Sequence, residues 1–259
     1  MNILIFDIET IPDIEGAGKI LGIERMPESE IFSAMCATRM QETNGNSNFI
    51  RLHLHKIVAI SVALKTPDRF EVLSIGDPDS TEQEIISKFF SGLEKYNPLL
   101  VSWNGSGFDL PVLHYRALVN KVVASHYWEN GDSIRDFKYN NYRSRYHERH
   151  IDLMDVLSGY QPKAFASLDD IATILGFPGK IGLSGKDVYQ KFKKGKLRDI
   201  RDYCESDVLT TWLVYLRFEY MRANLKLKHY EEHIELTKNF LKNSQKENFK
   251  TFLKVWNDC

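Results

Sequence analysis

Two acidic residues stand two positions apart near the start of the chain, in the stretch MNILIFDIET. Asn2–Phe6 is a short apolar run with β-branched residues, which predicts a buried strand that Asp7 and Glu9 bring to an end. Side chains at i and i+2 of a strand leave from the same face, so the two carboxylates would repel each other. A divalent cation such as Mg²⁺ removes that cost, because it takes oxygen ligands and substrate phosphates. The stretch therefore suggests a metal site used for phosphate chemistry.

Two other interpretations of this acidic pair are open. The acids could lie in a turn and cap a helix. The chain could also be a phosphatase with an Asp-x-Asp-x-Thr motif, in which the first Asp is the nucleophile. Here the second acid is Glu9, and Ile11 and Pro12 follow where that motif would continue. Further acids at suitable places downstream would favour the metal site.

A third acid follows a second apolar run. Leu99–Trp103 predicts a short buried strand, and the stretch NGSGFDLP follows it directly. Its glycines permit a tight strand-to-helix turn, and Pro111 fits the first turn of a helix, which puts Asp109 at or near the N-cap. Helix capping is the common use of such an Asp. The alternative is a metal carboxylate, because ligands gather at the carboxyl ends of strands in sheets of this kind.

A fourth acid lies inside the long helix predicted over Arg198–Glu219. Residues four apart occupy the same helical face, so Tyr203 and Asp207 should point the same way. A buried Asp on the apolar side of this helix needs a partner. A metal shared with the first two acids, a hydrogen bond from a core Ser and a salt bridge to Arg would each serve.

The remaining pattern alternates between strands and helices that must position these acids. The expected elements are a helix over 28–40, a strand over 56–64, a partner strand over 70–75 that is antiparallel to it, a helix capped by Thr81, a short edge strand over 150–153, a helix capped by Ser167, and one or two amphipathic helices over 221–258. The segment 14–49 has no role that the sequence reveals.

Composition excludes several classes of protein. The 259 residues are enough for one sizeable core, and the formal net charge of −1 means that any nucleic-acid footprint must be local. Cys36, Cys204 and Cys259 lack metal-type spacing, and their odd number argues against a disulfide framework. No apolar run approaches transmembrane length, and the first strand begins too early for a signal peptide. We therefore expect a cytoplasmic protein without a membrane partner.

Taken together, the three motifs resemble those of the DEDD 3′–5′ exonucleases. They are Asp-x-Glu on a first strand, Asn-x-x-x-Phe-Asp after a later strand, and Tyr-x-x-x-Asp on a late helix. Asp202, rather than His, stands five positions before Asp207, which indicates the tyrosine branch. The stretches DIETIPD, HKIVAIS, SWNGSGFDLP, HIDLMD and YCESDV resemble stand-alone predicted exonucleases related to the exonuclease domain of family B DNA polymerases.

This resemblance implies a fold and an organisation of the chain. The fold would be α/β and ribonuclease-H-like, with a mixed five-stranded sheet flanked by helices. The exonuclease domain would span residues 1–220, and residues 221–259 would form a C-terminal helical extension packed on the same domain.

The resemblance also implies a catalytic set and its cofactors. The set is Asp7, Glu9, Asp109, Tyr203 and Asp207, and its four acids would bind two divalent ions, Mg²⁺ or Mn²⁺. The first ion would be held by Asp7, Glu9 and Asp207. Asp7 would bridge to the second, which Asp109 would hold directly or through water. Two ions about 4 Å apart can activate a water and stabilise the leaving oxygen, and Tyr203 would orient that water.

Substrate contacts follow from the same resemblance. Thr10 and Ile11 correspond to positions that touch the terminal nucleotide, and Asn104 and Phe108 to positions that hold phosphate and stack on a base. Base stacking is worth about 1–3 kcal/mol and tolerates any sequence. The alternative for Phe108 is ordinary packing in the turn.

Further contacts come from the composition of two segments. The aromatic and basic stretch 127–149 and the basic loop 186–201, which begins with the candidate phosphate contact Lys186, are candidate tracks for the phosphate backbone. The alternative is a solvated surface, because acids dilute both segments. Asp152 and Asp155 could support the site, although helix capping is the commoner role.

The predicted function is that of a metal-dependent 3′–5′ exonuclease, which hydrolyses phosphodiester bonds of single-stranded DNA and releases nucleoside 5′-monophosphates. An exoribonuclease or oligonucleotide nuclease is the alternative enzyme, because sugar choice depends on contacts to the 2′-hydroxyl. A non-catalytic nucleic-acid-binding module is the alternative from another class. A proofreading accessory that acts with a polymerase or another replication or repair partner is a further alternative.

Overall fold

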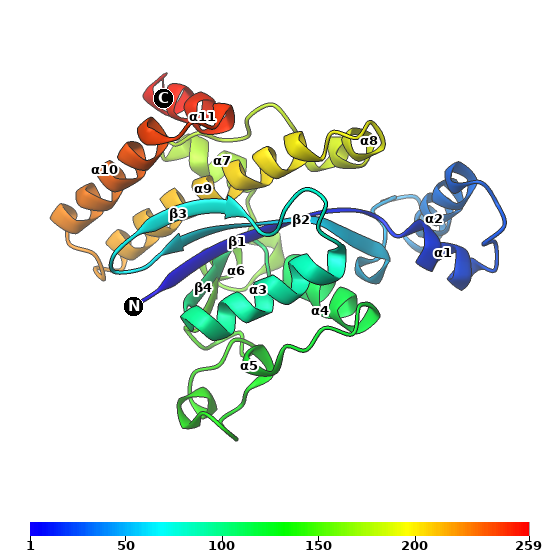
Figure 1. Cartoon of the computed structure of the whole chain (residues 1–259), viewed down its shortest axis with the longest axis horizontal. Helices are drawn as coiled ribbons and strands as arrows, with labels where there is room; N and C mark the ends of the chain where they lie inside the picture. The colour runs from blue at the N-terminus through cyan, green and yellow to red at the C-terminus, as the bar shows by residue number, and fades with distance from the viewer. Residues whose placement is uncertain (259) are drawn as a thin grey trace.

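Five strands form one mixed sheet in the computed structural model, which describes residues 1–258 (Figure 1). The strands are β1 (Ile3–Pro12), β2 (His55–Lys65), β3 (Phe70–Ser74), β4 (Leu99–Ser102) and β5 (His150–Asp152). They lie in the order β3-β2-β1-β4-β5. β2 is antiparallel to β1 and β3, whereas β4 is parallel to β1 and β5. The predicted mixed five-stranded sheet, its antiparallel pair β2–β3 and its edge strand β5 are confirmed.

Helices cover both faces of this sheet. On one face lie α3 (Glu82–Tyr96) and α4 (Asp109–Val119), and across the other runs α9 (Leu197–Met221), with α10 (Leu227–Asn243) and α11 (Glu247–Asp258) beyond it (Figure 1). The other helices are α1 (Ile14–Leu21), α2 (Glu28–Glu42), α5 (Ser125–Trp128), α6 (Leu153–Leu157), α7 (Leu168–Ile174) and α8 (Val188–Lys193). Short 3₁₀ turns lie at Leu52–Leu54, Arg135–Lys138, Pro162–Ala164 and Gly185–Asp187.

β1 is longer than its apolar run predicts. The expectation that Asp7 and Glu9 end the strand is wrong, because the strand continues to Pro12. The reason is tertiary: β2 supplies partners along the whole length, pairing Pro12 with His55. The register shifts between Glu9 and Thr10. Such a bulge re-aims side chains, and bulges are common next to functional sites.

Alternation along β1 assigns its side chains to the two faces. Leu4, Phe6 and Ile8 pack in the cluster that contains α3 and α4, whereas Ile5 packs in the cluster that contains α9. Because the side-chain period of a strand is two, the acids at positions 7 and 9 lie on the face of Ile5. The acidic pair is therefore directed toward α9.

β4 is short, and this leaves part of the edge of β1 open. β4 pairs with Ile3, Leu4 and Ile5 only, and the chain then turns into α4. The backbone of β1 beyond Ile5 therefore has no strand on that side within the described residues. Unpaired backbone groups at such an edge need other partners, and the first residues of α4 lie where they can supply one.

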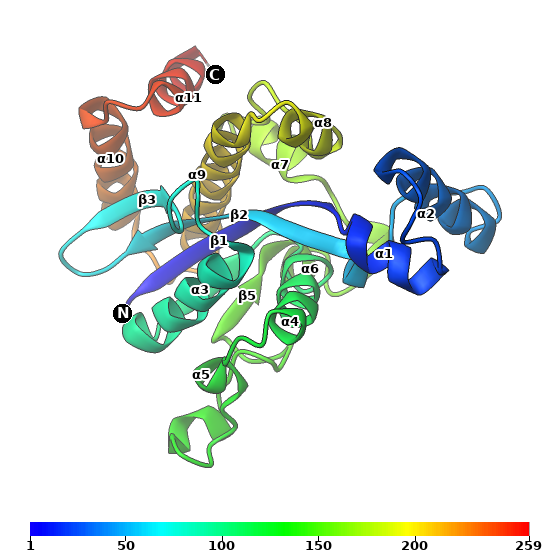
Figure 2. The ribbon, with the colours of Figure 1, turned by 45° about the vertical axis from the view of Figure 1, so that its right-hand side comes forward.

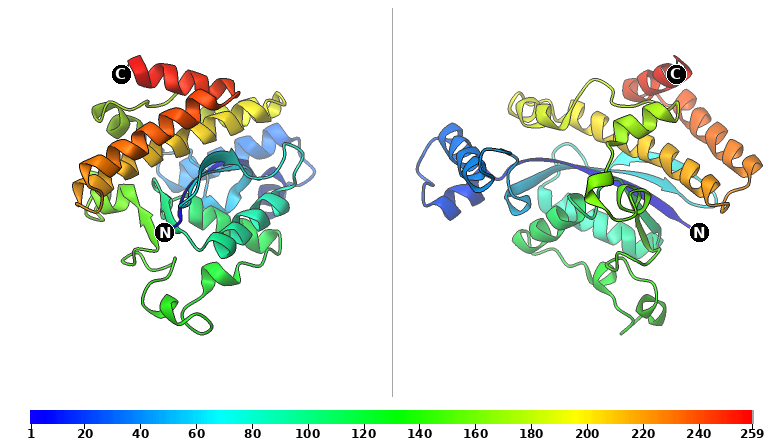
Figure 3. Two further views of the ribbon diagram at one scale, coloured as in Figure 1. Left: turned by 60° about the vertical axis from the view of Figure 1, so that its left-hand side comes forward. Right: turned by 180° about the vertical axis from the view of Figure 1, so that it is seen from behind.

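The long helix α9 is unbroken from Leu197 to Met221, which confirms the helix predicted there. Its buried Trp212 stacks on Phe70 of β3, with ring centroids 5.2 Å apart. Leu241 of α10 and Phe249 and Trp256 of α11 are buried in the same cluster, and Figure 3 shows these two helices lying over α9. The predicted amphipathic helices are thus confirmed, while a domain boundary at residue 220 stays a prediction. Among the described helices, none combines the length and the hydropathy that a membrane span requires.

The segment between β1 and β2 forms a separate pair of helices, α1 and α2, at the end of the sheet (Figure 1). The helix predicted over residues 28–40 is confirmed as α2. Ala17, Ile31, Met35 and Ile50 form a small apolar cluster of their own. This cluster stabilises the α1–α2 segment as a projection from the β1–β2 hairpin.

Candidate active site

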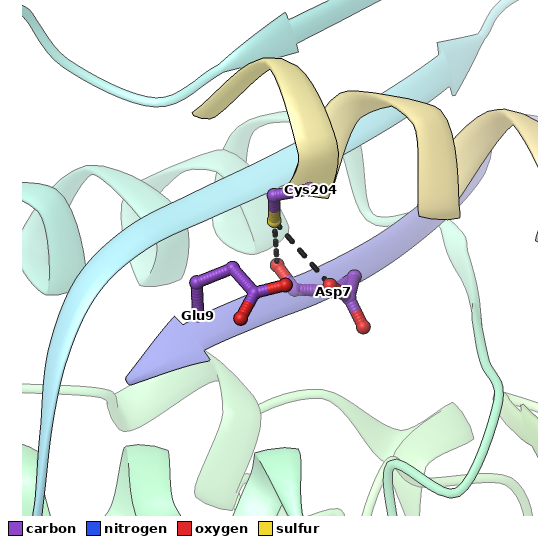
Figure 4. Close-up of side chains that lie close together, drawn as sticks. All are labelled: Asp7, Glu9 and Cys204. Atoms are coloured by element: carbon purple, nitrogen blue, oxygen red, sulfur yellow. Dashed lines mark hydrogen bonds between the residues drawn. The ribbon is translucent and has the colours of Figure 1, made fainter. Parts of the chain in front are cut away.

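Asp7 and Glu9 lie under α9, beside the thiol of Cys204 (Figure 4). Potential ligand atoms of these three residues lie within 4.8 Å of one another. The Cys204 thiol donates to the main-chain oxygen and to Oδ2 of Asp7, with Sγ 3.4 Å from each. Burial raises the pKa of this thiol, so Cys204 stays protonated and acts as a donor. It contacts the Asp7 carboxylate and leaves the other carboxylate oxygens of Asp7 and Glu9 available to a cation.

Asp109 joins this pair through the open edge of β1. Its Oδ1 accepts a hydrogen bond from the backbone N–H of Ile8, 3.1 Å away. The N-cap of α4 is Phe108, which makes no side-chain capping bond, and Asp109 is the first helical residue. The Asp109 carboxylate therefore binds the open edge of β1 and does not cap α4. It is buried, with 4% of its surface exposed.

Asp207 and Tyr203 lie one turn apart on α9, as predicted. Asp207 is near enough for its charge to raise the pKa of both Asp7 and Glu9, but it is not part of the group of ligand atoms within 4.8 Å of one another that Asp7 and Glu9 form with Cys204. Burial raises the pKa of the Tyr203 hydroxyl well above its usual range, and the charge of Asp207 adds to this. Tyr203 therefore remains a neutral hydrogen-bond donor beside the acids.

The four carboxylates carry more negative charge than the surrounding protein compensates. Burial is the largest cause of a raised pKa at each of them, and it brings the pKa of Asp109 and of Asp207 to about 7. Lys180 lowers the pKa of Glu9 and Asp207 but forms an ion pair with neither within the described residues.

Glu205, also on α9, differs from the four acids because a lysine compensates its charge. Lys246 contacts both of its carboxylate oxygens, at 2.7 and 2.8 Å. The four acids lack such a partner in residues 1–258. Clustered hard oxygen donors without a fixed cation are the chemistry that Mg²⁺ and Mn²⁺ prefer, so these residues fit divalent ions.

The candidate substrate residues are brought together only in part. The Thr10 hydroxyl lies 2.8 Å from Nδ1 of His55, and the His55 ring meets Phe108 edge-on, with centroids 5.2 Å apart. Thr10 and Phe108 thus meet through His55. Ile11 packs in a separate buried cluster with Ala59, Val188 and Ile200. Asn104 belongs to the β4–α4 turn, where φ is +62°.

Sequence reasoning missed several residues that shape this site. Cys204 directly follows Tyr203 in the YCESDV motif, and this position is the signal that could have indicated its closeness to the acids. His55 and the half-exposed Phe49 extend the aromatic contacts of Phe108, with the rings of Phe49 and Phe108 6.0 Å apart. No local pattern marks His55, Phe49 or Lys180, because each reaches the site through the tertiary fold.

Asp152, a candidate supporting residue, fixes the turn that leads to Asp109. Its Oδ1 accepts from the backbone N–H of Asn104 and its Oδ2 from that of Ser106, each at 2.8 Å. Oδ1 also accepts from the N–H groups of Met154 and Asp155, so Asp152 is the N-cap of α6 as well. The capping role is therefore confirmed, and the same carboxylate holds the turn. Asp155, the other candidate, pairs with Arg145 at 2.7 Å.

We expect Asp152→Ala to lower the free energy of unfolding by about 3 kcal/mol or more. The change removes the acceptor of four N–H groups, of which those of Met154 and Asp155 are buried and those of Asn104 and Ser106 are partly buried, and a buried unpaired group costs about 1–3 kcal/mol. Ser167→Ala is the matched control, because Ser167 caps α7 with a single bond to the N–H of Asp170 and should cost about 1 kcal/mol. Urea unfolding of both variants measures the difference, and equal losses would contradict this account of the turn.

A family model and two solved structures are similar to this chain. The family model described as "Predicted 3'-5' exonuclease related to the exonuclease domain of PolB" matches residues 47–256. No curated protein matches the chain. Among solved structures, the family B DNA polymerase from the hyperthermophilic archaeon Pyrobaculum calidifontis is 18% identical, with a TM-score of 0.48, over 82% of this chain and 24% of the polymerase.

A chain in a structure titled "ExoI/SSB-Ct complex" is 13% identical, with a TM-score of 0.32, over 87% of this chain and 46% of that one. The present chain thus spans about a quarter of the polymerase and less than half of the second protein. The family match covers most of the chain, including β2 to β5 and all but the last residues of α11. The chain belongs to the family of predicted 3′–5′ exonucleases related to the exonuclease domain of PolB, and its α/β fold is the ribonuclease-H-like fold expected from the sequence.

Proposed function

We propose that this protein is a metal-dependent exonuclease that hydrolyses single-stranded DNA from the 3′ end and releases nucleoside 5′-monophosphates by a two-metal-ion mechanism. The observation that carries the proposal is the convergence of four carboxylates from β1, α4 and α9 without a compensating cation among the described residues. The family to which the chain belongs supports the 3′–5′ direction.

The four acids divide between two ions in this proposal. Asp7, Glu9 and Asp207 would hold one ion, and Asp109 would hold the other together with Asp7. Bound divalent ions supply a more acidic water and stabilise charge on the leaving oxygen. The chain's own contribution is to fix these oxygens, through the Cys204 contact to Asp7 and the Ile8 contact to Asp109.

Tyr203 positions the attacking water. Its raised pKa keeps the hydroxyl protonated at neutral pH, so it donates or accepts a hydrogen bond rather than removing a proton. Tyr203 and Asp207 lie one turn apart on the same face of α9. A Tyr203→Phe variant thus keeps the acids and loses only the hydroxyl.

A nuclease assay tests the proposal. The substrates are 5′-labelled single-stranded DNA, 3′-recessed duplex DNA and RNA of matching sequence, incubated with Mg²⁺, Mn²⁺ or EDTA. The expected result is a ladder that shortens from the 3′ end of single-stranded DNA and is lost in EDTA. Faster degradation of RNA would replace the proposed DNA substrate by RNA. Intact substrates with both metals would refute a nuclease of either kind.

The segment around α8 tests the electrostatic part of the proposal. The expected basic loop is largely helical: Lys191 pairs with Asp199 at 2.8 Å, and Lys193 lies 4.6 Å from the centre of the Tyr189 ring. Replacing Lys191, Lys193 and Lys194 together by Ala should weaken single-strand binding. The negative slope of the logarithm of the binding constant against the logarithm of the salt concentration should become less steep by about 1–2. Lys228, Lys242 and Lys254, exposed on the C-terminal helices, form the matched triple control. An unchanged slope would remove α8 from the substrate track.

A further inference from the structure

The acidic site contains a sulfur atom as well as carboxylate oxygens. Cys204 lies on α9, which packs on β1 and β2 over the face that carries Asp7 and Glu9 (Figure 2). Its side chain is fully buried, and its Sγ lies 3.4 Å from Oδ2 of Asp7. Carboxylate oxygens suit Mg²⁺ and Mn²⁺, whereas thiolate ligands select softer ions such as Zn²⁺. The site therefore combines ligands of two chemical classes.

The separation between this sulfur and the Asp7 carboxylate fits one shared ion. In tetrahedral zinc sites the Zn–S bond is about 2.3 Å and the Zn–O bond about 2.0–2.2 Å, which puts the two ligand atoms about 3.5–3.6 Å apart. The distance of 3.4 Å between Sγ of Cys204 and Oδ2 of Asp7 is close to this value. A potential ligand atom of Glu9 lies within 4.8 Å of both. Small side-chain movements are therefore enough for the three residues to coordinate one ion.

Glu9 gives an independent indication that a cation belongs here. Its carboxylate is 7% exposed, and among residues 1–258 it accepts no hydrogen bond and forms no ion pair. Figure 4 shows this carboxylate directed toward Asp7 and Cys204. The thiol donates to Asp7 and not to Glu9. Because burying a carboxylate without a partner is costly, the geometry favours an ion that Glu9 shares with the other two residues.

We infer that Cys204 is a ligand for thiophilic divalent ions of the Zn²⁺ and Cd²⁺ class, which it binds together with Asp7 and Glu9. On binding, a metal–sulfur bond forms, the S–H bond breaks and the proton passes to the solvent, without transfer of electrons. Mg²⁺ takes oxygen ligands, so the thiol keeps its proton when this harder ion is bound. The inference rests on the proposed function, because it concerns the ions that the same acids bind. Cys204 thus sets the preference of the site between two competing classes of ion.

Titration of the complete chain with Cd²⁺ tests the inference without recourse to nuclease activity. A cadmium–thiolate bond produces a charge-transfer absorption in the ultraviolet, which cadmium bound to carboxylates alone lacks. The wild type should develop this absorption, and Cys204→Ser should lose most of it. Cys36→Ser is the matched control, because Cys36 is a partly buried free cysteine of α2 outside the acidic cluster, and it should keep the absorption. Equal absorption in Cys204→Ser and the wild type would overturn the inference.

The ratio of two dissociation constants separates ligation from a structural role of Cys204. Serine keeps a hydrogen-bond donor at this position but removes the soft ligand. The Kd for Mg²⁺ divided by the Kd for Cd²⁺ should therefore fall at least about tenfold in Cys204→Ser, which corresponds to about 1.4 kcal/mol, and should not change in Cys36→Ser. A structural role would weaken the binding of both ions alike. An unchanged ratio in Cys204→Ser would show that the sulfur is not a ligand.

Competition in the wild type locates the bound ion without any variant. Because both ions need the oxygens of Asp7 and Glu9, Mg²⁺ at about ten times its own Kd should weaken the apparent affinity for Cd²⁺ about tenfold. The charge-transfer absorption should then decrease at a fixed concentration of Cd²⁺. An absorption that does not respond to Mg²⁺ would mean that Cd²⁺ binds elsewhere on the chain, and this result would also overturn the inference.

The possible failures of the two proposals are distinguishable. If the protein degrades DNA from the 3′ end with Mg²⁺ but shows no absorption that depends on Cys204, the inference falls and the proposed function stands. If Cd²⁺ binds through Cys204 in competition with Mg²⁺ but no oligonucleotide is degraded, the ligand role of Cys204 stands and the proposed exonuclease activity falls. If neither Mg²⁺ nor Cd²⁺ binds to the wild type, both proposals fall together.

Discussion

We expect the Asp207→Asn variant to lose at least about a thousandfold in exonuclease activity and, in the absence of metal, to unfold at a higher temperature than the wild type. The activity falls because one of the oxygens proposed to hold the first ion becomes a neutral amide oxygen. The same change also weakens the hydrogen bond between Tyr203 and residue 207, because an amide oxygen is a weaker acceptor than a carboxylate. The effect on activity is the largest that this structure predicts for a single substitution.

The gain in stability has a separate physical cause. In the metal-free protein Asp207 is buried next to other acids, and its charge raises the pKa of Asp7 and Glu9. An amide of the same shape removes that repulsion, so the variant should unfold about 2–4 °C higher at pH 8, which corresponds to about 1 kcal/mol for a chain of this size. Thermal unfolding in EDTA measures the gain. A lower unfolding temperature would show that the acids do not repel one another.

Asp202→Asn is the matched control. Asp202 lies on the same helix and undergoes the same chemical change, but it lies near Glu205 and Lys246 rather than the four acids. Activity within about twofold of the wild type is expected, because no proposed ligand changes. Equal losses in Asp202→Asn and Asp207→Asn would mean that α9 tolerates no amide at all, and the assignment of Asp207 as a ligand would be withdrawn.

The second large effect is a pH dependence of stability that metal removes. Burial raises the pKa of Asp109 and of Asp207 to about 7, whereas an unfolded Asp has a pKa of about 3.9. Between these values the folded chain binds more protons than the unfolded chain, so its free energy of unfolding falls as the pH rises. From pH 5 to pH 8 the metal-free protein should lose on the order of a few kcal/mol.

Divalent ions should stabilise the protein more strongly as the pH rises. Metal binds the deprotonated carboxylates, and protons compete with it at low pH. The increase in Tm on adding Mg²⁺ or Mn²⁺ should therefore be small at pH 5.5 and grow steadily to pH 8.5. In Asp207→Asn, the stability of the metal-free protein should fall less with rising pH, and the increase in Tm on adding metal should depend less on pH. A Tm gain that does not change with pH would indicate that the ions bind elsewhere.

Local spacing alone was enough to single out the acids as candidates and to predict most of the elements that carry them. The separation of two residues between Asp7 and Glu9, and of four between Tyr203 and Asp207, determines which side chains share a face once the element type is known. The element types followed from apolar periodicity, as in α9 and in the strand β2. Such patterns depend on neighbours within a few residues, so a single sequence contains them.

The resemblance of three motifs supplied the long-range part of the prediction. No spacing in the sequence brings Asp109 to β1, since the two are about a hundred residues apart. The physical reason for the contact is that β4 ends early and leaves the Ile8 N–H open, and strand length depends on pairing partners rather than on local propensity. For the same reason the continuation of β1 to Pro12 could not be predicted from its apolar run.

By itself, then, the sequence determined the residue types that can do chemistry, the helices and strands that carry them, and through its motifs the family of the chain. Only the tertiary structure decided which neighbours complete the site. Cys204 beside Asp7 and His55 between Thr10 and Phe108 both depend on packing between distant segments. Packing selects partners by shape and burial across the whole fold, and no local period in a single chain encodes that choice.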